Sequence, residues 1–106
     1  ELFRREPDQR LYADDPLVHR RISARLWGEM QRASERLLSD AHRLRVPVLL
    51  QLAGHDTVVS NSASRDFGAR LAVRPGVIES EGAYHALYFD PVADQALGVL
   101  SDWLEQ

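Results

Sequence analysis

The sequence predicts an α/β fold in which helices cover a parallel sheet on both sides, giving three layers, α/β/α. The almost continuous apolar segment 46–53 has the length and composition of a strand, and Val77, Ile78 and Glu79 indicate a short second strand. Helical patterns precede, separate and follow these segments, so the order is helix, strand, helix, strand, helix. Because strands that alternate with helices pair in parallel through a right-handed crossover, we expect the two strands to be neighbours.

Composition narrows the class of protein. The chain has 106 residues, of which 44% are hydrophobic and 27% charged, values close to those of ordinary globular domains. A net charge of -3 leaves no basic surface for a nucleic-acid partner. Cysteine is absent, which excludes disulfides, thiolate metal sites and cysteine nucleophiles. No apolar stretch approaches the roughly 20 residues that span a bilayer, and the first residues lack the apolar core of a signal peptide, so the expected compartment is the cytoplasm.

The N-terminal part divides into a polar segment and a helix. Residues 1–16 are polar and contain two prolines, so we expect a loop or short helical turns, with Asp14–Pro16 as the start signal of the next helix. From residue 17 to residue 42 apolar side chains recur at steps of three and four, which predicts an amphipathic helix. A bend or a division into two helices is the alternative, because Gly28 lies inside it. The recurring residues are Ile22, Leu26, Met30, Ala33, Leu37 and Ala41.

The first strand ends in a candidate functional residue. Its almost continuous apolar run is typical of a strand that helices cover on both faces. The run stops at Gly54, His55 and Asp56. Since open α/β sheets place their chemistry beyond the carboxyl ends of the strands, Asp56 is a candidate carboxylate. The alternative is an ordinary turn, in which glycine supplies backbone freedom and aspartate bonds its own backbone.

The second half of the chain supplies two further helices and a strand. Ser60 or Asn61 is expected to cap a short helix, and the strand at 77–79 follows. The loop Glu81–His85 comes next, and Asp90 with the proline after it predicts the start of the last helix. The apolar stripe of that helix comprises Val92, Ala96, Val99, Leu100, Trp103 and Leu104.

Only two strands are visible in the sequence. Sheets usually need three or more strands to be stable alone, so two strands would leave apolar edges exposed. The sequence also opens on Glu1 rather than on methionine. We therefore expect more chain, or a partner subunit, to complete the sheet.

Asp56 and His85 form the candidate catalytic pair, because each follows a strand of the same parallel sheet. A buried carboxylate that accepts a hydrogen bond from one imidazole nitrogen orients the ring and leaves the other nitrogen free to act as a general base. His55 is not expected to take part, since neighbours in an extended turn point in different directions. No third ligand supports a metal site, and no cofactor is expected.

Several segments resemble one family. The stretch Val46–Asp56, the loop Glu81–His85 and the proline-started helix ending in Trp103 and Leu104 are similar to the C-terminal part of the α/β-hydrolases. The similarity is greatest to the branch of monoacylglycerol lipases, lysophospholipases and serine aminopeptidases of the S33 type. Residues 15–18 and the helix after them resemble the end of that branch's cap, or lid.

The resemblance implies a division of the chain. Residues 1–42 would be the end of the cap with a connecting helix, where substrate specificity could be set. Residues 43–106 would be the C-terminal part of the hydrolase core, with the last two of its eight strands. By the same resemblance, Asp56 matches the catalytic acid and His85 the catalytic base.

The third member of such a triad is absent from the sequence. In this family the nucleophile is a serine in a Gly-x-Ser-x-Gly turn that precedes the acid and the histidine in the chain. No serine here has a glycine both two residues before and two residues after it. We therefore expect the 106-residue chain alone to be inactive. A longer parent would be a serine hydrolase of carboxylic esters, such as monoacylglycerols or lysophospholipids.

Two other readings of the sequence stay open. One is a non-catalytic α/β module that packs, or forms a homo-oligomer, through its exposed sheet edges. The other keeps the acid and the histidine but uses an aspartate nucleophile, as related dehalogenases and epoxide hydrolases do. Tyr84, Tyr88 and Phe89 flank the histidine and fit either an acyl pocket or core packing.

Overall fold

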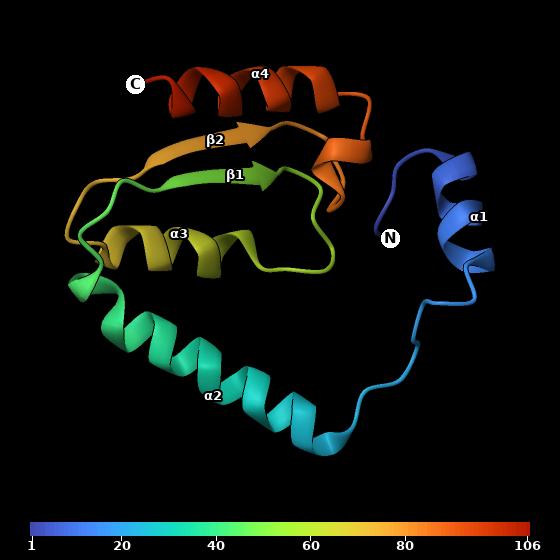
Figure 1. Cartoon of the computed structure of the whole chain (residues 1–106), viewed down its shortest axis with the longest axis horizontal. Coiled ribbons are helices and arrows are strands. Elements are labelled where there is room, and N and C mark those ends of the chain that lie inside the picture. Colours follow the sequence, from blue (N-terminus) through green and yellow to red (C-terminus); the bar gives the residue numbers. More distant parts are fainter.

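The computed structural model describes all residues from 1 to 106 (Figure 1). In chain order the helices and strands are α1 (Glu6–Asp14), α2 (Ala24–Asp40), β1 (Leu49–Ala53), α3 (Asn61–Arg70), β2 (Gly76–Ser80) and α4 (Ala93–Leu104); the short 3-10 helices η1 (Ala41–Arg43) and η2 (Leu87–Phe89) follow α2 and precede α4. From α2 onward, helices and strands alternate as the sequence predicts, which confirms the α/β class; one further helix, α1, precedes them.

The two strands pair in parallel, as predicted. The register runs from Leu49 opposite Gly76 to Ala53 opposite Ser80, so both strands end at the same edge of the sheet. In β1 only Leu52 and Ala53 are buried, so burial is confined to the end of the strand. The structure therefore places the residues that follow the two strands next to each other.

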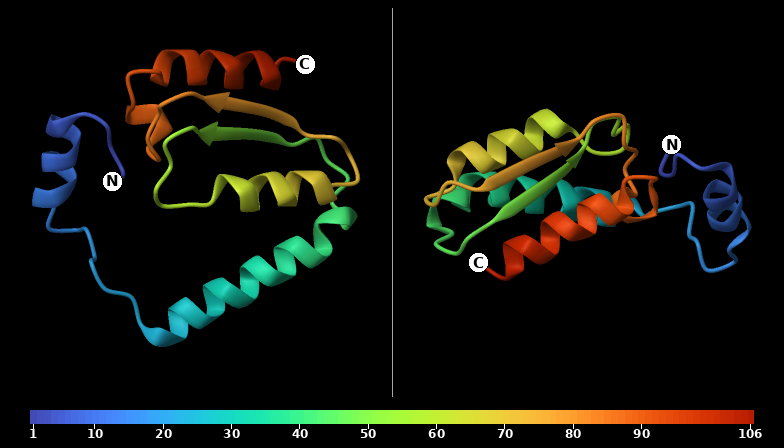
Figure 2. Two further views of the ribbon diagram at one scale, coloured as in Figure 1. Left: turned by 180° about the vertical axis from the view of Figure 1, so that it is seen from behind. Right: turned by 90° about the horizontal axis from the view of Figure 1, so that it is seen from above.

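Helices α3 and α4 cover opposite faces of the sheet (Figure 2). The Gln51 side-chain amide of β1 donates a 2.7 Å hydrogen bond to the Ala96 carbonyl of α4. On the α3 side, Gly68 lies so close to Leu50 that a Cβ added to the glycine would be 2.9 Å from the leucine side chain. Because adjacent residues of a strand point to opposite faces, the two contacts establish the three-layer arrangement.

Helix α2 is one continuous helix that begins later than predicted. Ser23 caps it by accepting a hydrogen bond from the Leu26 amide, and Gly28 does not divide it. The predicted start signal at Asp14–Pro16 is wrong, because the Asp15 carboxylate instead accepts the Leu17 amide in a turn. A helix cap requires the backbone to continue into a helix, and here no helix begins before Ala24, the residue after Ser23.

Residues 6–14 form the helix α1, where the sequence predicts a loop or short helical turns. Pro7 stands in the first turn of the helix, where its missing N–H costs nothing, so it does not act as a breaker. Phe3 packs against Tyr12 of α1 and against Phe89 of η2, with ring centroids 5.6 and 5.8 Å apart. Aromatic packing thus connects the N-terminal segment to the turn before α4.

The last two helices differ from each other in their caps. Ser60 caps α3 through its hydroxyl, which settles the choice between Ser60 and Asn61. Helix α4 begins at Ala93, with Val92 at the cap position and no side-chain cap, so the predicted cap at Asp90 is wrong by two residues. The Asp90 side chain is buried instead and bonds the loop after β2.

The packed centre is small and the molecule is open. Ala53, Ala83, Leu87 and Ala96 form the core cluster, and only eight of the 106 residues are buried. The radius of gyration, 15.7 Å, exceeds the about 13 Å of a compact domain of this length. None of the helices combines the length and apolar character needed to cross a membrane.

Candidate active site

Two loops meet at the carboxyl ends of β1 and β2. The Gly54 amide donates to the Ser80 carbonyl at 2.9 Å, and the His55 amide donates to the Ala83 carbonyl at 2.8 Å. A Cβ on Gly54 would lie 3.0 Å from backbone atoms of both Ser80 and Gly82, so only glycine fits here without displacing the backbone. Gly82 itself has a φ of 67°, the left-handed conformation that favours glycine. The two glycines therefore permit the close approach of the loops.

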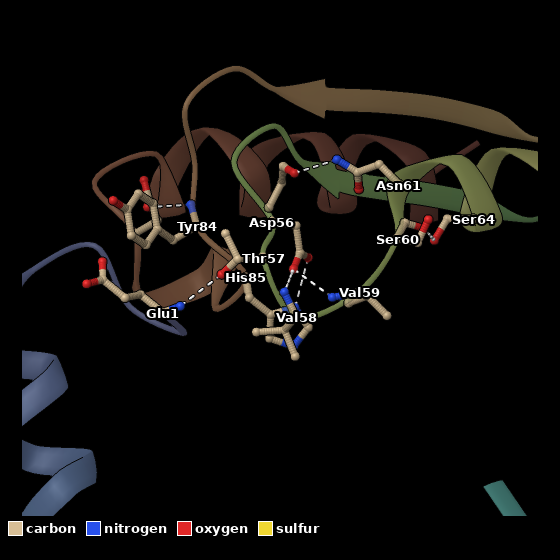
Figure 3. Close-up of polar contacts among 12 residues, drawn as sticks. Glu1, Asp56, Thr57, Val58, Val59, Ser60, Asn61, Ser64, Tyr84 and His85 are labelled. Atoms are coloured by element: carbon tan, nitrogen blue, oxygen red, sulfur yellow. Dashed lines mark hydrogen bonds and ion pairs between the residues drawn. The ribbon is translucent and has the colours of Figure 1, made fainter. Parts of the chain in front are cut away.

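Asp56 is fixed at the end of the turn after β1. One carboxylate oxygen accepts hydrogen bonds from the backbone amides of Val58 and Val59, at 2.8 and 2.9 Å. The other oxygen faces His85 (Figure 3). The carboxylate is thus held by its own loop in an aspartate turn, and the ordinary-turn interpretation of Asp56 is also correct.

His85 comes from the loop after β2 and bonds Asp56 directly. Its Nδ1 lies 2.9 Å from Asp56 Oδ2, and the aspartate side chain is 7% exposed and the histidine side chain 33% exposed. The pairing predicted from the two strand ends is therefore present in the structure.

The charge state of Asp56 follows from its surroundings. Burial disfavours the ionised carboxylate and would raise the pKa of Asp56. The hydrogen bonds from Val59, His85 and Val58 favour the ionised form and outweigh burial, so the pKa of Asp56 lies below its ordinary value. An ionised carboxylate only accepts hydrogen bonds, so the proton of the bond to His85 resides on Nδ1. In the neutral imidazole, Nε2 then carries a lone pair that can accept a proton.

A cavity of about 140 Å³ opens beside the pair. No serine hydroxyl of the chain bonds His85: Ser64, which lines the cavity, donates to the Ser60 carbonyl of its own helix. The chain thus presents an acid and a base at an open space without a nucleophile bonded to them. The lining residues are Gln51, Leu52, Ala53, Asp56, Val59, Asn61, Ser64, His85 and Leu87.

The neighbouring aromatic residues have other contacts. His55 stacks on Tyr84, with ring centroids 4.9 Å apart and planes at 37°, and it does not bond Asp56. Tyr88 donates to the Gln51 side chain of β1, and Phe89 packs on Phe3. Neither Tyr84 nor Tyr88 nor Phe89 lines the cavity beside His85. No group of three histidine, aspartate and glutamate side chains is arranged to hold a metal ion.

Sequence reasoning missed one residue of this region, Asp90. The sequence assigned it to a helix cap, but its carboxylate accepts the Tyr84 amide at 3.0 Å, next to His85. The only signal in the sequence was an acid five residues after the histidine, and an aspartate before proline is most simply explained as a cap.

Comparison with known proteins relates the fold to a family. The family model for serine aminopeptidase S33 matches residues 1–92. The crystal structure of the monoacylglycerol lipase of Paleococcus ferrophilus is similar, with a TM-score of 0.79 and 33% sequence identity over 97% of this chain. This chain covers 41% of the lipase chain.

A curated protein of Escherichia coli (strain K12), the uncharacterized protein YnbC, is 33% identical over 60 residues. Those residues are 57% of this chain and 10% of YnbC. The chain therefore spans less than half the length of either of these relatives.

Proposed function

The chain belongs to the serine aminopeptidase S33 family of α/β-hydrolases, and we propose that it supplies the acid and the base of a Ser-His-Asp hydrolase. The nucleophilic serine would lie outside these 106 residues. The observation that carries the proposal is the 2.9 Å hydrogen bond between Asp56 and His85 at the ends of adjacent parallel strands. The pair has the relation of acid and base that a triad requires.

In the proposed mechanism His85 moves the protons. Its free Nε2 takes the proton of the serine hydroxyl as the serine oxygen attacks the ester carbonyl, and then gives it to the departing alcohol oxygen. A water molecule hydrolyses the acyl-enzyme in the same way. Asp56 keeps the ring oriented and stabilises the imidazolium, and its low pKa keeps it ionised at neutral pH.

We propose carboxylic esters such as monoacylglycerols or lysophospholipids as substrates. Support comes from the similar structure, which is that of a monoacylglycerol lipase, and extends over nearly all of this chain. We further propose that residues 1–42 form the end of a cap over the site. Their contact with the catalytic side supports this, since the Leu2 carbonyl accepts the amide of Ala86, the residue after His85.

The test compares two histidines in the whole protein that carries this chain. His85→Ala should lower kcat for a monoacylglycerol by about 10⁴-fold or more, because the general base is lost. His55→Ala is the matched control: it removes an imidazole from the neighbouring loop that does not bond Asp56, and it should keep most of the activity. Retention of activity by His85→Ala would refute the proposal.

The alternative, a non-catalytic module, rests on the exposed strand β2. Gly76, Val77, Ile78 and Glu79 are all exposed, which leaves this edge open to pairing with another chain. This alternative predicts a stable dimer and no hydrolysis of any ester by the whole protein. Sedimentation and the same ester assay therefore separate the two functions.

A further inference from the structure

Asp90 is a buried carboxylate that the proposed mechanism does not use. Its side chain is fully buried, in the segment between η2 and α4. One oxygen accepts the Tyr84 amide at 3.0 Å, and the other accepts the Val92 amide at 3.3 Å (Figure 3 shows the Tyr84 end). Arg4 Nη1 lies 3.8 Å from the second oxygen.

These bonds close the loop that carries His85. Tyr84 directly precedes His85, and Val92 directly precedes α4, so the carboxylate ties both ends of the segment 84–92 to one point. Burying a carboxylate costs several kcal/mol unless hydrogen bonds replace its water. Here two backbone amides replace that water, and both would lose their partner if the loop moved.

The catalytic pair alone does not fix this loop. A single hydrogen bond, from Nδ1 to Asp56, holds the His85 ring, and the His85 backbone lies in a bend before η2, outside any helix or strand. The distance between Nδ1 and Asp56 therefore depends on the position of the backbone at residues 84 and 85 and not on the hydrogen bond alone. Asp90 bonds that backbone one residue before His85.

We propose that Asp90 is a positioning residue for His85, acting through the Tyr84 amide and not through contact with the reacting atoms. This inference rests on the proposed role of His85 as general base. The hydrogen bonds carry the effect rather than the charge of Arg4, because the arginine side chain is 47% exposed and its distance is long for a direct bond.

The test is Asp90→Asn in the whole protein. The Tyr84 and Val92 amides bind different oxygens of Asp90, so in the asparagine variant one of these two donors would face the NH₂ group, which is itself a donor. The matched control is Asp94→Asn, the same change at an exposed position four residues later, and Arg4→Gln removes the ion pair alone. Two quantities are measured: the ester kinetics, and the proton NMR resonance of the hydrogen-bonded Nδ1–H of His85.

Asp90→Asn should lower kcat by about 10- to 100-fold with KM nearly unchanged, because the base is misplaced while the substrate site is intact. The Nδ1–H resonance should broaden or move upfield in this variant. Asp94→Asn should resemble the unchanged protein in both measurements, and Arg4→Gln should leave the Nδ1–H resonance unchanged. An Asp90→Asn protein with normal kcat and an unchanged resonance would overturn the inference.

The positioning role of Asp90 can still be tested if the unchanged protein is inactive or if Asp90→Asn does not fold. If the unchanged protein hydrolyses no ester, the proposed function fails, and the resonance still tests the positioning by itself. If Asp90→Asn does not fold, Asp90→Glu keeps both oxygens and should give an intermediate kcat, while the Tyr84 amide of the unchanged protein should exchange its hydrogen slowly. Rapid exchange at Tyr84 would contradict the inference whichever variant folds.

Discussion

At the scale of single residues, Asp56 combines three hydrogen bonds on two oxygens. Val58 and Val59 occupy one oxygen and His85 the other. The backbone amides of its own loop therefore hold the Asp56 carboxylate in one orientation relative to the imidazole. Replacement by an isosteric amide tests how much of the proposed catalysis depends on this orientation.

Asp56→Asn in the whole protein should lower kcat by about 10⁴-fold, the loss seen when the acid of a serine-protease triad becomes an amide. The amide can present its NH₂ group to Nδ1, which would place the histidine proton on Nε2 and remove the base. The measurement is kcat for an ester substrate, with Asp66→Asn on the exposed side of α3 as the control. A variant with most of its activity would exclude Asp56 from the triad.

Asp56 should also make stability depend on pH in the acid range. Its folded-state pKa lies below the unfolded value of about 3.9, so the stabilisation is complete above that value and disappears as the pH falls through the folded-state pKa. The difference in melting temperature between the unchanged protein and Asp56→Asn should therefore shrink below about pH 4. A difference that stays constant from pH 6 to pH 3 would show that ionisation of Asp56 does not stabilise the fold.

At the scale of elements, the contact between the two loops depends on Gly54. A Cβ there would meet backbone atoms of Ser80, Glu81 and Gly82 at 3.0 to 3.1 Å, and backbone atoms cannot move aside as a flexible side chain does. Gly54→Ala should therefore cost about 1–3 kcal/mol of unfolding free energy and loosen the bond between Asp56 and His85.

The control for this change is Gly98→Ala in α4. A Cβ at Gly98 meets nothing within 4 Å, so the substitution should stabilise the helix by about 0.5–1 kcal/mol. Denaturant titration of both variants gives the two free energies. Equal stability of Gly54→Ala and the unchanged protein would show that the loops have room for a side chain.

Some of these elements could be predicted from the sequence and others could not. The strands, a cap at Ser60 or Asn61 and the meeting of Asp56 with His85 could be predicted, because apolar runs, capping residues and parallel pairing act locally or by topology. Helix α1 and the burial of Asp90 could not. Helix α1 is connected through Phe3 to Phe89, far along the chain, and Asp90 bonds the Tyr84 amide within its own loop; neither contact leaves a periodic signal in the sequence.

At the scale of the whole molecule, α2 exposes an apolar stripe. Leu26, Trp27 and Met30 are 48, 54 and 49% exposed, and the helix meets α3 only near its end (Figure 1). A soluble monomer rarely leaves such a surface uncovered. We expect the isolated 106-residue chain to associate with increasing concentration and to bind a hydrophobic dye, whereas the whole protein should not.

Light scattering over a range of concentrations measures the association of the isolated chain, and dye fluorescence on the same samples measures its exposed apolar surface. An isolated chain that stays monomeric and unfolds cooperatively would show that the two-stranded sheet and its helices are stable alone. The matched variant is Trp27→Gln, which should reduce both the association and the dye signal without affecting the bond between Asp56 and His85.

The most direct test of the central claim uses a fluorophosphonate probe, which labels activated serines. The whole protein and the isolated chain are each treated with the probe, and the intact mass is read afterwards. We predict labelling of the whole protein alone, and loss of that labelling in His85→Ala. Labelling of the isolated chain would contradict the claim that the nucleophile lies outside it. Labelling of neither would contradict the assignment of Asp56 and His85 to a serine hydrolase.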